Sequence, residues 1–462
     1  MFERSTYSNR RHQLIQSLEG GIALFLGNEL SSMNYHDNHY HFRQDSSFLY
    51  YFGIDQPHLA AIVDIDAGHS TLFGDDPSVE MIVWTGPQVA LKELAIKVGI
   101  ENTSSYNKLF EYIQQAQQAN RKIHILPPYR PENKILLAQC LNTSLEGIAN
   151  WVSRPLIETV VKQRSIKEAN EIVQMEEAVN LSAQMHLNTI QKAKPGLIES
   201  QLAGQATGIA LSGGGQLSYP IIMTINGQTL HNHYHGNELQ SGQLLLGDYG
   251  AENAMHYAGD ITRTIPIDAT FTDRQKEIYE IVLAAEQEVI DVLRPNITYL
   301  DMHKKAAGII TEGLKALGLM KGDTQEAVEQ GAHALFFPHG LGHMIGLDVH
   351  DMEDLGEDLV GYDEEIQRSP LFGYKSLRLG RRLQAGFVLT VEPGIYFIPE
   401  LVQQWQKEQK FKSFINYQAV KKYLNFGGIR IEDNVLITSD GHRVLGNPIP
   451  KTVAEIEAIR MS

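Results

Sequence analysis

Up to about residue 150, short apolar runs bounded by Gly, Asp or Pro alternate with stretches whose apolar residues recur every three or four positions. The short runs have the length of β-strands, and the stretches have the periodicity of amphipathic helices. This alternation predicts an α/β domain with a mixed sheet. We expect strands at residues 20–27, 58–66 and 121–128, and helices at residues 87–100 and 108–119.

Long stretches with helical periodicity follow in the rest of the chain. Ser165 and Glu168 match the S-x-x-E pattern of a capping box, which predicts the start of a long helix that ends before Pro195. A second long helix is expected over residues 272–293, before Pro295. Strand-like segments separate the helices, so we predict an α+β domain with a curved antiparallel sheet. The expected domains are residues 1–155 and 156–462.

Length, composition and charge narrow the class of protein. A chain of 462 residues exceeds the usual size of one core, and 43% hydrophobic with 20% charged residues is ordinary for a globular enzyme. The net charge of −16, without a Lys/Arg stripe, argues against nucleic acid as a partner. The single cysteine, Cys140, excludes an internal disulfide. A polar N-terminus and the lack of long apolar stretches predict a cytoplasmic protein without a signal peptide or membrane span.

Five residues that could bind metal are spread over the last two-fifths of the chain, each in a short segment containing glycine. Four carboxylates and one imidazole form an oxygen-rich donor set, which favours Mn²⁺, Co²⁺, Fe²⁺ or Zn²⁺ over a thiolate-type site. This negative charge is sufficient to hold two divalent cations, and a pair of cations activates water. The set therefore predicts a hydrolase. Its members are Asp248, Asp260, His343, Glu392 and Glu432.

Each carboxylate also has an ordinary interpretation when it is considered alone. Two Asp residues near glycines are typical of turns. Glu432 alternates with isoleucines and shares a strand face with Arg430, which is also the pattern of a surface ion pair. Glu392 differs, because it lies between an apolar run and a Pro-Gly turn and is therefore expected to be buried. A buried carboxylate needs a partner or a metal ion.

Histidines form two further clusters. His339, His343 and His350 lie within a short segment whose glycines favour a bent strand or loop over a helix. One of these imidazoles can bind metal, and the others can donate hydrogen bonds to an oxyanion or transfer protons. The second cluster is the LHNHYHGNE run with His231, His233 and His235, of which at least one is expected to be an ordinary turn residue.

These segments resemble the signature of the pita-bread metallopeptidases, and more narrowly the Xaa-Pro peptidases, aminopeptidase P and prolidase. The resemblance extends from Phe42 to beyond Glu432. The segment FRQDSSFLYYFGIDQP is similar to the start of the creatinase-like N-terminal domain of this family. The segments SLRLGRRLQAGFVLTVEPGIYF and FGGIRIEDNVLIT, with the stretch 398–425 between them, are most similar to the prolidase branch.

The resemblance implies two divalent metal ions, Mn²⁺ before the alternatives. Asp248 would bind one ion, His343 and Glu392 would bind the other, and Asp260 and Glu432 would bridge both. Glu392 would also assist proton transfer.

The resemblance also implies roles for residues around the metals. His339 and His350 would stabilise the tetrahedral intermediate, and His231 would lie near the scissile bond, with His233 as an alternative. Expected substrate contacts are Arg378, which meets the substrate carboxylate in prolidases, Arg430, which precedes the bridging Glu, and Asp37 and Trp84, which match positions near the substrate in aminopeptidase P.

The expected reaction is hydrolysis of the bond between an N-terminal residue and a following proline. Arg378 and the prolidase-like stretch favour an Xaa-Pro dipeptidase, whereas Asp37 and the FRQDSSF and HNHYHGN segments favour an Xaa-Pro aminopeptidase, which we prefer. A metal-free creatinase-like enzyme or a non-catalytic pita-bread binding protein is disfavoured, because all five ligand positions are filled. We expect proline-containing peptides or dipeptides as partners, no nucleic acid or membrane, and a homodimer or homotetramer.

Overall fold

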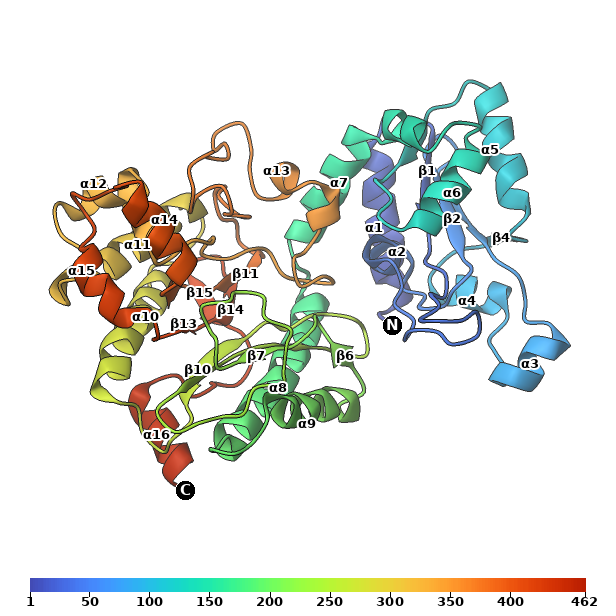
Figure 1. Cartoon of the computed structure of the whole chain (residues 1–462). Coiled ribbons are helices and arrows are strands. Elements are labelled where there is room, and N and C mark those ends of the chain that lie inside the picture. Colours follow the sequence, from blue (N-terminus) through green and yellow to red (C-terminus); the bar gives the residue numbers. More distant parts are fainter. The chain divides into compact units, whose positions relative to one another are not determined.

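The computed structural model describes all 462 residues and contains two compact units (Figure 1). Unit 1 consists of Met1–Arg164 with Asp354–Leu359, and unit 2 of Ser165–Glu353 with Val360–Ser462. The predicted domain boundaries, residues 1–155 and 156–462, stay a prediction. None of the helices combines the length and the hydropathy that a membrane crossing requires.

A mixed five-stranded sheet forms the centre of unit 1. Its order is β4-β3-β2-β1-β5, in which β1 is antiparallel to β2 and parallel to β5, and β3 is parallel to β4. The three strands and two helices expected in this part of the chain are confirmed. The strands are β1 (Ile22–Leu26), β2 (Ala60–Asp64), β3 (His69–Phe73), β4 (Asn102–Ser104) and β5 (Ile123–Ile125).

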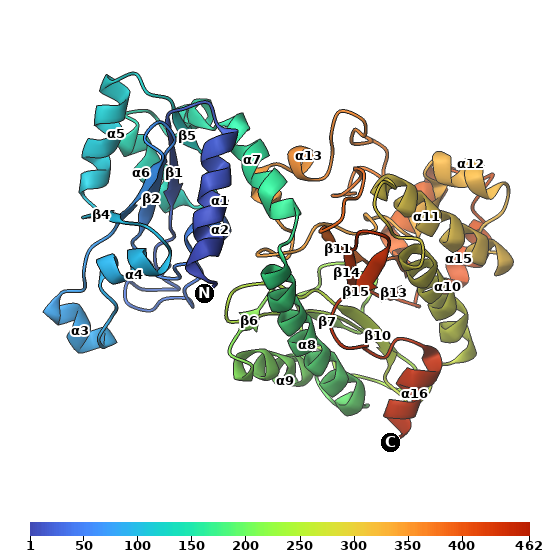
Figure 2. The same cartoon turned by 180° about the vertical axis from the view of Figure 1, so that it is seen from behind.

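Helices cover both faces of this sheet, so its short apolar strands are buried on each side. In Figures 1 and 2, α1 and α2 lie on one side of the sheet and α5 and α6 on the other. Ile22 and Leu24 share a core cluster with α5 and α6, while Phe25 contacts Tyr51 of α2 at a ring distance of 5.0 Å. The helical elements are α1 (Arg4–Ser17), α2 (Ser46–Phe52), α3 (Val79–Thr85), α4 (Leu91–Lys97), α5 (Lys108–Gln118), α6 (Pro131–Cys140), η1 (Glu146–Trp151) and α7 (Arg154–Ser165).

The long helices of unit 2 match the sequence pattern, with one correction at the first start. Helix α8 ends at Lys192, before Pro195, and α10 begins after its cap Thr272, as expected. However, Ser165 ends α7 and does not cap α8. The cap is Glu168, whose side chain accepts from the backbone of Glu171 while the Glu171 carboxylate accepts from the backbone N–H of Glu168 at 3.0 Å. The capping box therefore lies three residues later than the sequence pattern indicated.

The strands of unit 2 pair only in antiparallel fashion, as predicted. The sheets have the orders β10-β8-β7, β11-β14-β15, β12-β13 and β6-β9, and single bridges at Thr262–Glu432 and Met344–Leu389 link neighbouring segments. The strands are β6 (Gln216–Leu217), β7 (Ile222–Thr224), β8 (Leu244–Asp248), β9 (Ala251–Glu252), β10 (Thr262–Pro266), β11 (Val388–Val391), β12 (Gly394–Tyr396), β13 (Gly428–Arg430), β14 (Asp433–Ile437) and β15 (His442–Val444).

Two pairs of long helices, α8 with α9 and α10 with α11, pack around these strands (Figures 1 and 2). The helical elements of this part of the chain are α8 (Ala169–Lys192), α9 (Glu199–Ser212), α10 (Asp273–Ile290), α11 (Tyr299–Ala316), α12 (Thr324–Glu329), η2 (Ala332–Leu335), η3 (Glu353–Leu355), α13 (Glu357–Val360), α14 (Pro399–Lys407), α15 (Tyr417–Val420), η4 (Lys421–Tyr423) and α16 (Val453–Met461).

Arg263, on β10, joins the sheets of unit 2 through a buried network. Its guanidinium donates to the carbonyls of Thr262, Glu432, Ile449 and Pro450 and pairs with Asp433 at 2.6 Å. The Asp433 carboxylate also pairs with Lys451, which pairs with Glu286 of α10, each at 2.6 Å. This network ties β10 and β14 to the segment before the C-terminal helix.

Substituting Arg263→Met should destabilise unit 2 by roughly 3–5 kcal/mol, because it leaves several buried acceptors without a donor and removes one member of a buried ion pair. Urea denaturation followed by tryptophan fluorescence and circular dichroism measures this loss. The control is Glu111→Ala, which removes an exposed partner of Lys108 and should change stability by less than about 0.5 kcal/mol. Equal effects of the two substitutions would contradict the assigned role of Arg263.

Candidate metal centre

A cavity of about 470 Å³ opens among the sheets of unit 2. Its lining combines all five candidate ligands with candidate histidines and arginines from distant segments. Every residue that lines it belongs to unit 2. The polar residues lining it are Tyr219, His231, His233, Asp248, Asp260, His339, His343, His350, Ser376, Arg378, Glu392, Arg430 and Glu432.

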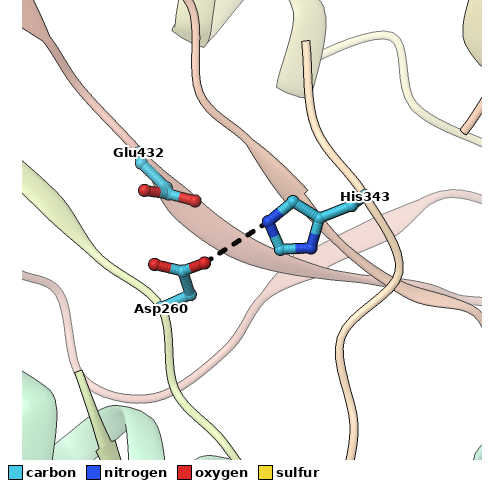
Figure 3. A group of neighbouring side chains, drawn as sticks. All are labelled: Asp260, His343 and Glu432. Atoms are coloured by element: carbon cyan, nitrogen blue, oxygen red, sulfur yellow. Dashed lines mark ion pairs between the residues drawn. The ribbon is translucent and has the colours of Figure 1, made fainter. Parts of the chain in front are cut away.

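Asp260, His343 and Glu432 form the tightest cluster of potential ligands. One ligand atom from each lies within 4.8 Å of the others, and all three residues are buried. The side chains converge from three separate segments, and His343 Nε2 lies 3.4 Å from Asp260 Oδ2 (Figure 3). Two carboxylates and one imidazole at this spacing form a site for a divalent metal ion.

Hydrogen bonds from the backbone N–H groups hold three of the candidate ligands in position. The Glu432 N–H donates to the Thr262 carbonyl at 3.1 Å, and the Asp260 N–H donates to the Asn434 side chain at 3.0 Å. The N–H of Glu392, another candidate ligand, donates to the Leu341 carbonyl at 2.8 Å. These bonds connect strand ends to loops, so the ligands are held by the sheets and not by flexible side chains alone.

A hydrogen bond of His343 selects which of its nitrogens faces the cluster. Its Nδ1 lies 3.0 Å from the carbonyl of Met344, an acceptor, so Nδ1 carries the proton. Nε2 faces Asp260 at 3.4 Å and Glu392 at 3.5 Å. Although burial lowers it, the hydrogen bond to Asp260 and the charges of both carboxylates raise the pKa of His343, so Nε2 donates to Asp260. A cation bound among these groups would take the place of that proton. This arrangement is typical of a metal-binding histidine.

Asp248 lies at the end of β8, opposite Thr262 in the register of β10. Tyr219 donates its hydroxyl hydrogen bond to Asp248 at 2.6 Å and also contacts Asp260, so one phenol connects the two aspartates. Arg430 pairs with the other oxygen of Asp248. Arg430 is 3% exposed and Glu432 1%, which excludes the surface ion pair that their sequence pattern also allowed.

The four carboxylates interact unfavourably without a cation. Burial, together with the charges of Asp260, Glu392 and Asp248, raises the pKa of Glu432 well above its ordinary value. Burial likewise raises the pKa of Glu392 to about 7. Although burial opposes ionisation of Asp260 as well, its hydrogen bond to His343 lowers the pKa of that carboxyl.

One atom of Glu432 shows directly that this site suits a cation. Its Oε2 accepts a hydrogen bond from Thr262 at 2.6 Å, but its buried Oε1 has no hydrogen-bond partner. A buried carboxylate oxygen without a partner is costly, and a divalent cation bound among the carboxylates removes that cost. The residues present therefore fit a divalent metal ion.

His339 is held by neighbouring groups at both ring nitrogens. Nδ1 donates to the Gly340 carbonyl at 2.7 Å, and Nε2 accepts from the Tyr396 hydroxyl at 2.8 Å. Arg430 in turn donates to that hydroxyl at 2.7 Å. Burial, followed by the charge of Arg430, lowers the pKa of His339 to about 3. His339 is therefore a neutral imidazole, positioned by Tyr396 at the cavity wall.

His350 stacks edge-on against His343, with ring centroids 4.3 Å apart. Its Nδ1 donates to Glu353 at 2.7 Å, and the other oxygen of that carboxylate pairs with Arg378. The hydrogen bond from His350, with the charges of Arg378 and His350, holds the pKa of Glu353 at about 2 against burial, so Glu353 is a carboxylate at neutral pH.

The structure places the remaining candidates in two different regions. His231 and His233 both line the cavity, and His233 Nδ1 lies 3.5 Å from the Ile221 carbonyl. Asp37 and Trp84 are exposed residues of unit 1 and do not line the cavity. Their expected substrate contacts, like the catalytic roles of the histidines, stay predictions.

Sequence reasoning missed three side chains that organise the site, namely Tyr219, Tyr396 and Glu353. Tyr219 stands between Ser218 and Pro220, and Tyr396 follows Glu392 in the VEPGIY segment, but neither sequence indicates what the tyrosine hydroxyl contacts. Glu353 follows His350 by three residues, a spacing that allows contact within a turn. That spacing was the one available signal.

Comparisons with known proteins agree with this geometry. Residues 173–439 match metallopeptidase family M24, and residues 7–125 match the N-terminal domain of aminopeptidase P. The Xaa-Pro dipeptidase of Homo sapiens is 31% identical over 459 residues, covering 97% of this chain and 90% of that protein. The Xaa-Pro aminopeptidase of Escherichia coli is 29% identical over 472 residues, covering 99% and 98%.

Solved structures extend the similarity over the whole chain. Zinc-substituted E. coli aminopeptidase P in complex with product superimposes with a TM-score of 0.81 at 28% identity and covers 100% of this chain and 98% of that one. Proline aminopeptidase P II from Yersinia pestis gives 0.82 at 28% identity, covering 100% of both chains. The resemblance to the Xaa-Pro peptidases and the predicted two-domain pita-bread fold are confirmed.

Adding Mn²⁺ or Zn²⁺ to metal-free protein should raise its melting temperature, because the ion binds only the folded carboxylate cluster. At about a hundred times its dissociation constant, the ion adds about 2.7 kcal/mol of stability. Differential scanning calorimetry measures the shift. In Asp260→Asn the shift should be largely lost, whereas in Glu111→Ala it should stay intact. A full shift in Asp260→Asn would show that the ion binds elsewhere.

Proposed function

The chain belongs to metallopeptidase family M24, and we propose that it is an Xaa-Pro aminopeptidase, which hydrolyses the bond between an N-terminal residue and a following proline. The observation that carries the proposal is the convergence of five potential metal ligands on one cavity beside His231, His339 and His350. Similar proteins named Xaa-Pro aminopeptidase span nearly the whole chain, which supports the same activity here.

We propose two divalent ions, with Mn²⁺ preferred, as the cofactors. Asp248 would hold one ion, His343 and Glu392 the other, and Asp260 and Glu432 both. When bound, such ions supply a water of lowered pKa and polarise the scissile carbonyl. The donor set supports this proposal because it is rich in oxygen and contains no thiolate.

The residues around the ligands would manage protons and developing charge. Glu392, on the cavity wall, would take the proton released by the attacking water and deliver it to the departing nitrogen. His350, oriented through Nδ1 by Glu353, would donate from Nε2, when protonated, to the oxyanion on the scissile carbonyl. His231, with His233 as the alternative, would lie near the scissile bond.

The apolar part of the cavity suits a proline ring. The bond before proline is a tertiary amide without an N–H, so recognition must rely on ring packing and on the carbonyl. Pro220, Ile222, Leu230, Pro338 and Val349 supply an apolar wall beside the candidate ligands. A cavity of about 470 Å³ accommodates a small peptide end.

An Xaa-Pro dipeptidase is the second candidate function. Arg378 lines the cavity, where a guanidinium could bind the free carboxylate of a dipeptide, and the human relative of that name is 31% identical.

We also propose, from the sequence, a cytoplasmic homodimer or homotetramer in which Asp37 and Trp84 approach the substrate. Light scattering of the purified protein measures the oligomeric state.

With Mn²⁺ present, the protein should hydrolyse Ala-Pro-Ala faster than Ala-Pro, because an aminopeptidase leaves room beyond the proline. Release of free alanine, measured by chromatography, gives both rates. Asp260→Asn should lower both rates by at least about a hundredfold, since it alters a proposed ligand of both ions. Hydrolysis of Ala-Pro alone would favour the dipeptidase, and cleavage of neither peptide would overturn both candidates.

A further inference from the structure

Glu353 bridges two side chains that line the active-site cavity. One carboxylate oxygen accepts from His350 Nδ1 at 2.7 Å, and the other pairs with the Arg378 guanidinium. The Glu353 side chain is 40% exposed and that of Arg378 31%, so the pair lies where a substrate can approach it. Arg378 therefore meets incoming substrate as part of an ion pair.

The other arginine of the cavity is also paired. Arg430 contacts the Asp248 carboxylate, donates to Tyr396 at 2.7 Å and donates to Thr262 at 3.2 Å. Arg378 and Arg430 are the only Lys or Arg residues that line the cavity. Both are thus engaged by carboxylates of the chain itself.

This arrangement penalises one class of substrate. In a dipeptide, the proline carries a free carboxylate, which must either displace Glu353 from Arg378 or bind beside it as a like charge. In a longer peptide, a neutral peptide bond occupies the same position and needs neither change. The electrostatic penalty therefore applies to dipeptides and spares longer substrates.

We infer that Glu353 is a specificity-determining residue, which directs the site toward peptides that carry a neutral group after proline. The inference rests on the proposed function and deepens it, because it identifies a residue that separates an aminopeptidase from a dipeptidase. Glu353 would act on the substrate by occupying Arg378, which distinguishes it from a residue that only orients His350.

Two substrates of nearly equal size isolate the effect of charge, namely Ala-Pro and its amide, Ala-Pro-NH₂. We would measure kcat and KM for both with wild-type protein, Glu353→Gln, Glu353→Ala and the control Glu365→Gln. The control removes the charge of an exposed carboxylate that pairs with Arg382 and does not line the cavity. Circular dichroism verifies that each variant is folded.

Wild-type protein should prefer the amide. In Glu353→Gln and Glu353→Ala, the ratio of kcat/KM for Ala-Pro to that for the amide should rise by about tenfold, equivalent to about 1.4 kcal/mol, mainly through a lower KM for Ala-Pro. Glu365→Gln should leave the ratio unchanged. The double variant Glu353→Gln with Arg378→Met should lose the gain, because the released guanidinium is then absent.

An unchanged ratio in both Glu353 variants would overturn the inference, and so would an equal fall in kcat for both substrates, which would assign Glu353 only to orienting His350. Failure of the proposed function has a different signature. In that case wild-type protein would cleave neither Ala-Pro-Ala nor the amide, and the inference would fall with it.

Discussion

Buried carboxylates that crowd around one cavity repel each other and lose their hydration. The contacts that surround the cavity in unit 2 depend on this electrostatic constraint. Asp248 is compensated by Arg430, and Asp260 by His343. Glu432 retains a buried oxygen without any hydrogen-bond partner, and burial raises its pKa well above the ordinary value. The protein groups therefore offset only part of the negative charge, and a divalent cation bound there would supply the compensation that is missing.

The surrounding fold makes that arrangement rigid. Antiparallel sheets bring together segments that are almost two hundred residues apart, such as those of Asp248 and Glu432. Behind them, Arg263 ties the backbone of Glu432 to Asp433 and to the segment before α16. Since the ligands are fixed by backbone hydrogen bonds, the site is preorganised before a cation or a substrate arrives.

Residue types and periodicity were sufficient to predict the elements and the ligand types. The mixed sheet of unit 1 and the long helices follow from local patterns, and the five candidate ligands were selected by residue type. Their assignment to two ions came from the family resemblance and stays a prediction. The cap of α8 was misassigned because Ser165 and Glu168 match the S-x-x-E capping pattern, whereas the true capping box lies three residues later. There the side chains of Glu168 and Glu171 accept hydrogen bonds from each other's backbone N–H groups.

What escaped prediction depends on contacts between distant segments. Tyr219 connects two aspartates, and Tyr396 positions His339, although the sequence around neither tyrosine indicates these contacts. The role of Glu353 depends on its ion pair with Arg378, which lies 25 residues later in the chain. Such tertiary partners cannot be derived from spacing alone, and they determine how one ligand set is directed to one class of peptide.

The most direct test of the metal centre is a crystal structure of the protein with Mn²⁺, analysed by anomalous scattering. The account predicts two anomalous peaks per chain, both within coordination distance of Asp260 and Glu432, with Asp248 near one and His343 and Glu392 near the other. A cavity without a peak, or peaks bound only outside it, would contradict the account.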